Sequence, residues 1–374
     1  MLAICMIRTG GPEVLEARDV PIPALPTPHH VRVRLCAAGV NPIDTKLRKN
    51  GTYYPDRLPT VLGCDGAGVV ETLGNAVTRF RANDEVYFFH GGIGNEPGNY
   101  AQYNVVHEDY LARKPKHLSF AEAAAVPLAL ITAWEALHDR ARLKAGEQVL
   151  IHAAAGGVGH VAVQLAKHRG ARVAATVGSR GDSSFGDGGK APKAASFIPT
   201  TMRPLPKTHS PRALGATASG ADRFAFVKSL GAERIIDYKS EDFVPAVLDW
   251  TGGRGVDTTL DTVGGDTFCR SFAATKVYGN VVTLLQTACD ADAVKHARLR
   301  NQSIHYELML TPLYLGLHTA RVAQRHILEE GANLIEQGRL KVHVSRELAL
   351  AQAAEAHRLL EAGHTTGKIV LRIE

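Results

Sequence analysis

The segment that most constrains this chain is a glycine-rich turn between a predicted strand and a predicted helix. The sequence AAAGGVGHVAVQLAKHRGARVAATVGS, residues 153–179, contains the pattern G-x-G-x-x-A at Gly157, Gly159 and Ala162. Gly157 permits a tight turn, Gly159 lets the backbone approach a pyrophosphate, and Ala162 lets the helix pack closely on its strand. Free amides and the positive end of the helix dipole then face the phosphates. Because the pattern lies inside a βαβ unit, it predicts a dinucleotide-binding loop rather than an ordinary strand–helix turn.

The sequence around this loop has two different patterns. Residues 1–127 contain short alternating or glycine-bounded strands, such as HVRVRLCAAGV, GAGVVETLG and DEVYFF, and we expect this part to be all-β. A helix is expected to begin at Ser119, where Glu122 completes a capping box. Strands and helices alternate over residues 128–311, which predicts a doubly wound parallel sheet. Residues 312–374 contain helices and the strand KIVLRI, which we expect to return to the first domain, giving an α/β protein of two domains.

Residues 180–220 interrupt this alternation. They are rich in Pro, Gly and Ser, have no periodicity, and exceed the roughly 12–15 residues above which structureless loops become uncommon. Without them, the strand RVAATV would run directly into the helix ADRFAFVKSLG. We therefore expect an insertion without stable structure, with a functional lid and a retained intron as the alternatives.

The charge of the chain is concentrated in that insertion. The formal net charge is +6, and residues 180–220 carry +4 of it. The rest of the chain therefore offers no basic footprint for a nucleic acid. No apolar run approaches the roughly 18 residues of a membrane span. The first residues, MLAICMIRTGGPEVLE, lack the pattern of a signal peptide, so we expect a cytoplasmic protein without membrane or nucleic-acid partners.

The sulfur- and imidazole-bearing residues show no ligand pattern. Five cysteines stand far apart and form no CxxC, so we expect neither a disulfide framework nor a structural zinc site. The 17 histidines are scattered without a recognised metal-ligand spacing.

The end of the second strand of the βαβ unit bears on the choice of cofactor. An acid at this point would accept hydrogen bonds from the ribose 2′-hydroxyl of NAD and repel the 2′-phosphate of NADP. Here the strand ends at Gly178 and Ser179, with Arg180 and Arg223 nearby in the sequence, which favours NADPH. Asp182, inside the insertion, is an acidic alternative that would favour NADH.

Four segments together resemble the zinc-independent quinone oxidoreductases of the medium-chain dehydrogenase/reductase superfamily: HAAAGGVGHVAVQLAK, GVNPIDTKLR, LGCDGAGVVETLG and TTGKIVL. The similarity covers nearly the whole chain except residues 180–220. It implies a mostly β GroES-like catalytic domain (1–127 and 312–374) and a Rossmann NADPH-binding domain (128–311). The implied activity is NADPH-dependent reduction of quinones or α,β-unsaturated carbonyls by hydride transfer. A homodimer formed through edge strands of the cofactor domain is also implied.

The same resemblance bears on zinc. Zinc-dependent members of the superfamily have Cys after the GV of the first domain and a His–Glu pair after a later Leu-Gly. This chain has Asn41 at the first position and Cys64–Asp65 at the second. An amide is a poor zinc ligand, so one thiolate and one carboxylate lack a third partner. We therefore expect no metal, and catalysis by positioning and by hydrogen bonds to the oxygen that gains charge.

The resemblance also assigns site residues. It places Asn41 beside the nicotinamide and the substrate, with Asp44 in the same turn to orient it. Tyr53 and Tyr54 are candidate proton donors or aromatic walls, for which ordinary packing is the alternative. The expected cofactor contacts are Asn41, Thr132, Ala155, Gly157, Val158, Gly159, Ser179, Arg180, Arg223, Tyr238, Val263, Gly264, Leu284, Leu285, Gly367 and Lys368.

Two other functions stay open from the sequence. An enoyl-thioester reductase would use the same fold and cofactor but would need a long acyl pocket. An NADPH-binding protein with little catalysis, acting as a structural or RNA-binding protein, would bind RNA through residues 180–220 and turn over no electrophile.

Overall fold

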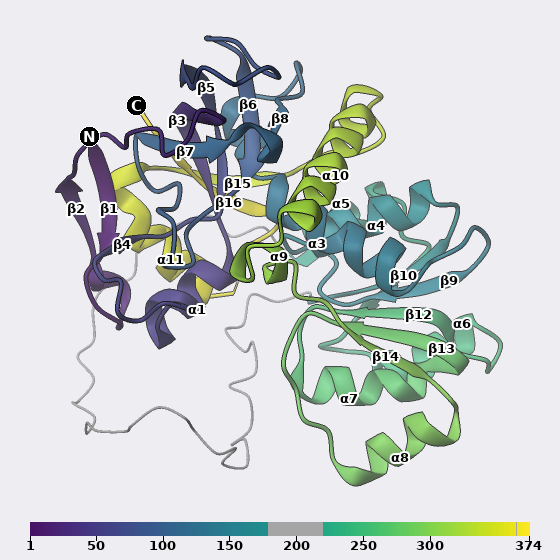
Figure 1. Ribbon diagram of the computed structural model, residues 1–374. Helices are drawn as coiled ribbons and strands as arrows, with labels where there is room; N and C mark the ends of the chain where they lie inside the picture. Colours follow the sequence, from purple (N-terminus) through teal and green to yellow (C-terminus); the bar gives the residue numbers. More distant parts are fainter. Residues whose placement is uncertain (179–219, 364) are drawn as a thin grey trace, which may run out of the picture.

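The computed structural model describes residues 1–178, 220–363 and 365–374 (Figure 1). Ser179 and residues 180–219 of the predicted insertion lie outside the described residues, so the expectations about them stay predictions. Within the described ranges, no helix is long and apolar enough to cross a membrane.

A six-stranded sheet carries the glycine-rich loop. Its strand order is β11-β10-β9-β12-β13-β14, and every pair is parallel. The chain starts in the middle at β9 and winds outward in both directions, so the topological switch point lies between β9 and β12. The predicted doubly wound sheet is confirmed. Its strands are β9 (Gln148–Ile151), β10 (Arg172–Val177), β11 (Arg234–Asp237), β12 (Val256–Asp261), β13 (Thr275–Thr283) and β14 (Ser303–Tyr306).

Within the described residues, five helices connect these strands. The first of them, α4, joins β9 to β10 directly after the glycine-rich loop, and its apolar residues Val161 and Leu165 are buried. The helices are α4 (Gly159–His168), α5 (Gly220–Ser229), α6 (Phe243–Trp250), α7 (Gly265–Ala274) and α8 (Ala291–Leu299).

The second large sheet combines both ends of the chain. Its strand order is β15-β16-β3-β5-β6-β8, and β7 pairs with β3. The last strand runs antiparallel to β3, with Ile369 opposite Val40, so the C-terminal residues return to the N-terminal sheet. A small sheet of order β2-β1-β4 lies beside it (Figure 1). The strands are β1 (Leu2–Met6), β2 (Leu15–Asp19), β3 (His30–Val40), β4 (Thr60–Val61), β5 (Asp65–Leu73), β6 (Glu85–Phe89), β7 (Tyr103–His107), β8 (Leu111–Arg113), β15 (Val344–Ala349) and β16 (Lys368–Arg372).

The all-β expectation for the N-terminal part is wrong, because this part also contains helices. Helix α1 (Pro42–Asn50) follows β3 directly. Pro42 presets the backbone for the first helical turn, and the Asn41 N–H donates to Asp44 Oδ2 at 2.8 Å, which fixes the start of the helix. The remaining short helices of this part are η1 (Pro12–Val14) and η2 (Glu108–Tyr110).

The connection between the two sheets is helical. Helix α2 (Phe120–Ala124) begins after Ser119, whose Oγ accepts from the Glu122 N–H at 3.2 Å, so the predicted capping box is confirmed. The other helices here and near the C-terminus are α3 (Pro127–Trp134), the π-helical turn η3 (Glu135–Arg140), α9 (Thr311–Tyr314), α10 (His318–Glu336), η4 (Leu350–Gln352) and α11 (Ala353–Glu361).

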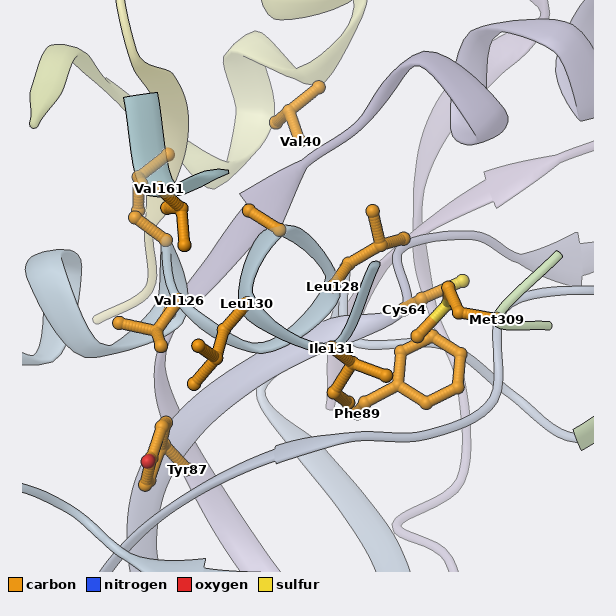
Figure 2. Packing of buried hydrophobic residues seen from close by; sticks show 14 of the residues in the cluster. Val40, Cys64, Tyr87, Phe89, Val126, Leu128, Leu130, Ile131, Val161 and Met309 are labelled. Carbon is orange, nitrogen blue, oxygen red and sulfur yellow. The ribbon is translucent and has the colours of Figure 1, made fainter. Parts of the chain in front are cut away.

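Helix α3 lies in the main apolar core. Figure 2 shows its residues Leu128, Leu130 and Ile131 in one cluster with Tyr87 and Phe89 of β6. Helix α10 packs on the same helix, and a Cβ placed on its Gly331 would lie 2.1 Å from Leu130 Cδ2. The glycine therefore permits the close approach of α10 and α3.

The cysteines correct one expectation. Cys269 on α7 and Cys289, in the loop before α8, form a disulfide with Cα atoms 5.5 Å apart. The sequence separation of 20 residues gave no pattern that predicts this pair. The parallel β13 carries the chain back past α7 and so brings the two side chains together.

Gly331→Ala should lower the free energy of unfolding by about 1–3 kcal/mol, because the new methyl group overlaps the fully buried Leu130. Chemical denaturation would measure this. In a Leu130→Ala background the same substitution should cost less or nothing, because the methyl group fills part of the cavity. An equal cost in both backgrounds would contradict the close contact.

Candidate functional site

The glycine-rich loop has the backbone geometry that a bound pyrophosphate requires. A Cβ on Gly159 would lie 2.3 Å from the Ala153 carbonyl oxygen, so only glycine fits there. Within the described part of the chain, the amides of Gly157 and Val158 donate to no acceptor. They stand at the N-terminus of α4, where the helix dipole favours an anion. The loop therefore fits the phosphates of a dinucleotide.

The C-terminal segment is fastened to this loop by two hydrogen bonds. The Gly367 N–H donates to the Ala155 carbonyl at 2.8 Å, and the His343 N–H donates to His160 Nε2 at 3.3 Å. His160 Nδ1 in turn donates to the Gly156 carbonyl at 2.8 Å. Burial lowers the pKa of His160 to about 4, so its imidazole is neutral and its tautomer is fixed by these partners.

Lys368 connects the loop to a buried polar cluster. A Cβ on Gly157 would lie 3.2 Å from Lys368 Cδ. The ammonium donates to Asn41 Oδ1 and lies 3.4 Å from Asp65 Oδ2. Asn41 Nδ2 donates to the same carboxylate oxygen at 2.9 Å. Three residues from β3–α1, β5 and β16 thus meet in one hydrogen-bonded group beside the loop.

Asp65 also caps the neighbouring helix. Its Oδ1 accepts from the Leu128 N–H at 2.8 Å in the first turn of α3. Burial raises the pKa of Asp65, while Lys368, Asn41 and the Leu128 amide act in the opposite direction. Within the described residues, no group of three or more His, Cys, Asp and Glu side chains is arranged to hold a metal ion.

Asp44 belongs to a second buried chain behind Asn41. The Tyr100 hydroxyl donates to Asp44 Oδ2 at 3.0 Å and lies 3.3 Å from His357 Nε2. The Cys64 thiol lies 4.0 Å from Asp44 Oδ1. Burial raises the pKa of Asp44 to about 7, although the Asn41 amide and the Tyr100 hydroxyl lower it in part. The carboxyl therefore exchanges its proton near neutral pH.

Asp261, at the carboxyl end of β12, fixes the turn that precedes α7. Its carboxylate accepts from the Val263 and Gly264 amides at 3.0 and 2.9 Å and from Thr283 Oγ1 at 2.7 Å. These bonds hold the turn before α7 against the end of β13. Leu284 and Leu285 follow directly, and a Cβ on Gly264 would lie 2.7 Å from Leu285 Cδ1. The predicted contacts Val263, Gly264, Leu284 and Leu285 thus lie together.

The end of β10 faces Tyr238. A Cβ on Gly178 would lie 2.6 Å from the Tyr238 hydroxyl oxygen, and the Lys239 ammonium lies 5.5 Å from the centre of the Tyr238 ring. Arg223 lies on α5. Ser179 and Arg180 lie outside the described residues, so the structure does not place them relative to Tyr238.

Three of the remaining candidates have local partners. Thr132 Oγ1 donates to the Leu128 carbonyl at 2.7 Å inside α3. The rings of Tyr53 and Tyr314 have centroids 4.9 Å apart, and the Tyr54 hydroxyl donates to the Tyr314 carbonyl at 3.1 Å. Both tyrosines thus contact Tyr314 of α9.

Sequence reasoning missed the residues that connect these groups. His160, Tyr100 and His357 were not singled out, and Asp65 was considered only as a remnant of a zinc site. His160 stands next to Gly159 in the loop motif, so the motif itself was a signal for it. Nothing local in the sequence marks Tyr100 or His357, because their contact joins residues 257 positions apart.

Comparison with known proteins shows which family the chain belongs to. Residues 27–116 match the family model described as alcohol dehydrogenase GroES-like domain, and residues 230–371 match the one described as zinc-binding dehydrogenase. A quinone oxidoreductase of Pseudomonas aeruginosa is 34% identical over 97% of this chain and 96% of its own length. The chain belongs to the quinone oxidoreductase family of the medium-chain dehydrogenase/reductase superfamily.

Solved structures agree on the fold. The quinone oxidoreductase of Escherichia coli complexed with NADPH has a TM-score of 0.78 and 28% identity, covering 100% of both chains. A structure described as an NAD-dependent alcohol dehydrogenase has a TM-score of 0.81 and 32% identity, also covering 100% of both chains. As a member of this family, the protein is an NAD(P)-dependent oxidoreductase with a GroES-like and a Rossmann part, and the predicted family, fold class and enzyme class are confirmed.

Lys368→Met should lower the free energy of unfolding by about 3–5 kcal/mol, because it leaves the Asp65 carboxylate buried without its cation. Chemical denaturation at pH 7 would measure the loss. The double variant Lys368→Met/Asp65→Asn should recover a large part of it, since an amide needs no counter-ion. A double variant as unstable as Lys368→Met alone would contradict this account.

Asp44→Asn should remove a pH dependence of stability. With its pKa raised from 3.8 to about 7, the Asp44 carboxyl stabilises the fold fully below pH 3.8, and this contribution is lost as the pH rises to about 7. Between pH 5 and pH 7 the free energy of unfolding of the unmodified protein should therefore fall by about 2–3 kcal/mol more than that of the variant. Parallel pH profiles in the two proteins would contradict the raised pKa.

Proposed function

We propose that the protein reduces quinones or α,β-unsaturated carbonyls with NADPH, by hydride transfer without zinc. The observation that carries this proposal is the buried group of Lys368, Asn41 and Asp65 beside the dinucleotide loop. In our proposal, the Lys368 ammonium supplies the positive charge that a metal cation would otherwise supply.

The dinucleotide, when bound, supplies the hydride from its nicotinamide ring. The chain's own residues bind and orient it: the Gly157 and Val158 amides face its phosphates, and Val263, Gly264, Leu284 and Leu285 form the opposite wall. These are the residues expected from the sequence, and their common location at the switch point supports the assignment.

Lys368 has the chemistry to stabilise the oxygen that gains charge. An ammonium has three N–H donors, and two of them are directed to Asn41 and Asp65. We propose that the third is directed to the substrate oxygen, because a hydrogen bond from a cation is strong in a buried position. Asn41 fixes the ammonium through its carbonyl oxygen and is itself fixed by Asp65, so the group is preorganised.

The Asp44 carboxyl holds a proton next to this group. Asp44 contacts the backbone of Asn41, and its pKa of about 7 lets it gain or lose that proton at neutral pH. We assign to Asp44 the role of keeping Asn41 in place and holding a proton close to the reaction, while solvent or a nearby hydroxyl such as that of Tyr53 protonates the product.

The donor set supports the absence of zinc. At the positions where zinc-dependent members carry ligands, this chain has Asn41, Cys64 and Asp65. Asp65 is already paired with an ammonium, and burial raises the pKa of the Cys64 thiol well above its ordinary value, with Asp44 and Asp65 adding to the shift. A neutral thiol, an amide and a paired carboxylate do not fit a zinc ion.

The choice of NADPH rests on the end of β10. Gly178 carries no carboxylate there, and Tyr238 closes over it with Lys239 against its ring. The small polar Ser179 with Arg180 and Arg223 is the predicted 2′-phosphate site. The E. coli relative bound to NADPH supports this choice, whereas the neighbour described as NAD-dependent shows that the fold accepts the other cofactor too.

We further propose a cytoplasmic homodimer, with a catalytic domain of residues 1–127 and 312–374 and a cofactor domain of residues 128–311. Strand β14 lies at the edge of the cofactor sheet. Large apolar side chains are exposed on and around it, with Tyr278 at 73%, Leu299 at 74% and Tyr306 at 61% exposure. Such an apolar edge is typical of a covered interface.

The test of this function is consumption of NADPH by the purified chain with an ortho-quinone, a para-quinone, an enal, an enoyl thioester and a simple ketone, with NADH in parallel. Turnover of quinone or enal with NADPH and none of the ketone is the expected result. Lys368→Gln should then lower kcat by about 10–100-fold with a smaller effect on the Kd of NADPH, because it removes a charged hydrogen bond made in the transition state.

The other outcomes contradict parts of the proposal. Preference for NADH would overturn the assignment of the 2′-phosphate site. Turnover of the enoyl thioester alone would favour the enoyl-thioester reductase. Binding of NADPH without any turnover, together with RNA binding that disappears when residues 180–220 are deleted, would favour the non-catalytic alternative.

A further inference from the structure

A cavity at the C-terminal end of α4 is independent of the site above. Its volume is about 420 Å³. Helices α4 and α5 form one wall with Gln164, Lys167, His168 and Ser229, and the segment after α10 forms the other with Arg339 and Lys341. The cavity and the glycine-rich loop lie at opposite ends of α4, which has ten residues and is therefore about 15 Å long.

The lining of this cavity is strongly basic. Lys167, Arg339 and Lys341 contribute two ammonium groups and a guanidinium group, and His168 adds a fourth basic side chain. No Asp or Glu lines the cavity, and none of the four forms an ion pair within the described residues. Burial lowers the pKa of His168, and the nearby Arg339 and Arg169 lower it further.

The two walls are held in place before any ligand binds. The Lys341 N–H donates to Gln164 Oε1 and Gln164 Nε2 donates to the Lys341 carbonyl, both at 2.8 Å. Leu340, between Arg339 and Lys341, is buried. The stem of Lys167 packs over Gly231, where a Cβ would lie 3.1 Å from Lys167 Cγ. The backbone that carries these basic side chains is therefore fixed, while the four side chains themselves are exposed.

Helix dipoles explain part of this arrangement. Basic residues are favourable at helix C-termini, and Lys167 and His168 end α4. The helix dipole does not explain why Arg339 and Lys341, which belong to the segment after α10, line the same cavity as Lys167 and His168. Unpaired like charges at close range are unfavourable, and a bound anion compensates them.

We propose that this cavity binds a small, multiply charged oxyanion of the phosphate class, such as a phosphorylated small molecule. Its volume is within the range of small-ligand sites, and three cationic side chains match the charge of a pyrophosphate or a phosphate monoester with a second acidic group. A bound oxyanion connects α4 to the segment that returns to the catalytic domain and so adds a bridge between the two parts of the chain.

Isothermal titration calorimetry with inorganic pyrophosphate at pH 7 tests this site. The full-length chain is first saturated with NADPH, so that the dinucleotide loop is filled. One binding event with a Kd below about 1 mM is expected, weaker at higher salt. No heat of binding, or a signal that disappears when NADPH is present, would overturn the proposal.

A pair of double variants locates the binding. Lys167→Met/Arg339→Gln keeps the stem of Lys167 over Gly231 and removes two charges from the cavity, and it should weaken pyrophosphate binding at least 10-fold. Lys295→Met/Arg298→Gln removes the same number of charges from exposed positions on α8, far along the chain, and should bind like the unmodified protein. Equally weakened pyrophosphate binding in both double variants would show a general effect of net charge and would contradict the proposed site.

The result does not depend on the proposed enzymatic activity. Were the chain not to bind NADPH, pyrophosphate could occupy the glycine-rich loop as well, and the cavity variant would then retain that binding. The unmodified protein should then bind two pyrophosphates and Lys167→Met/Arg339→Gln one, so an equal number of sites in both proteins overturns the cavity whatever the cofactor does. Near-ultraviolet circular dichroism confirms that each variant is folded.

Discussion

The contact of Lys368 with Asp65 and Asn41 joins the elements that form the candidate site. Its members come from β16, β5 and the junction of β3 with α1, and Asp65 also caps α3. A buried carboxylate and a buried ammonium are each costly alone, so each residue requires the other. The same ammonium stem lies against Gly157, which brings the charged group to the dinucleotide loop. One ion pair thus connects the fold of the N-terminal sheet to the place where chemistry would occur.

The relation between the two sheets depends on hydrogen bonds made by α4 and by the loop that precedes it. Gln164 holds Lys341, His160 holds His343, and the carbonyl of Ala155 holds Gly367. All three partners belong to the chain that returns from the cofactor part to the N-terminal sheet. Helix α4, whose N-terminus faces the phosphate site, therefore also fixes the segment that carries Lys368. The position of the ammonium and the position of the loop are set by the same short stretch of backbone.

Local patterns predicted the elements and missed the contacts. The alternation in HVRVRLCAAGV gave β3 with its observed bounds, and G-x-G-x-x-A placed the loop before α4, because both patterns act over a few residues. Helix α1 was missed because Pro42 and Asp44 start it within a region of strands. The Cys269–Cys289 bond and the Asp65–Lys368 pair join residues 20 and 303 positions apart, and only the folded sheet order brings them together. Family resemblance named Lys368 as a cofactor contact, but its bond to Asp65 needed the structure.

The central claim is that Lys368, and no metal, supplies the positive charge at this site. The most direct test is the metal content of the purified, actively turning-over enzyme, measured by plasma mass spectrometry on the same sample before and after chelation. Full activity with less than about 0.1 zinc atom per chain, unchanged by the chelator, is the result that this account predicts. About one zinc atom per chain, with activity lost on its removal and restored on its return, would contradict it.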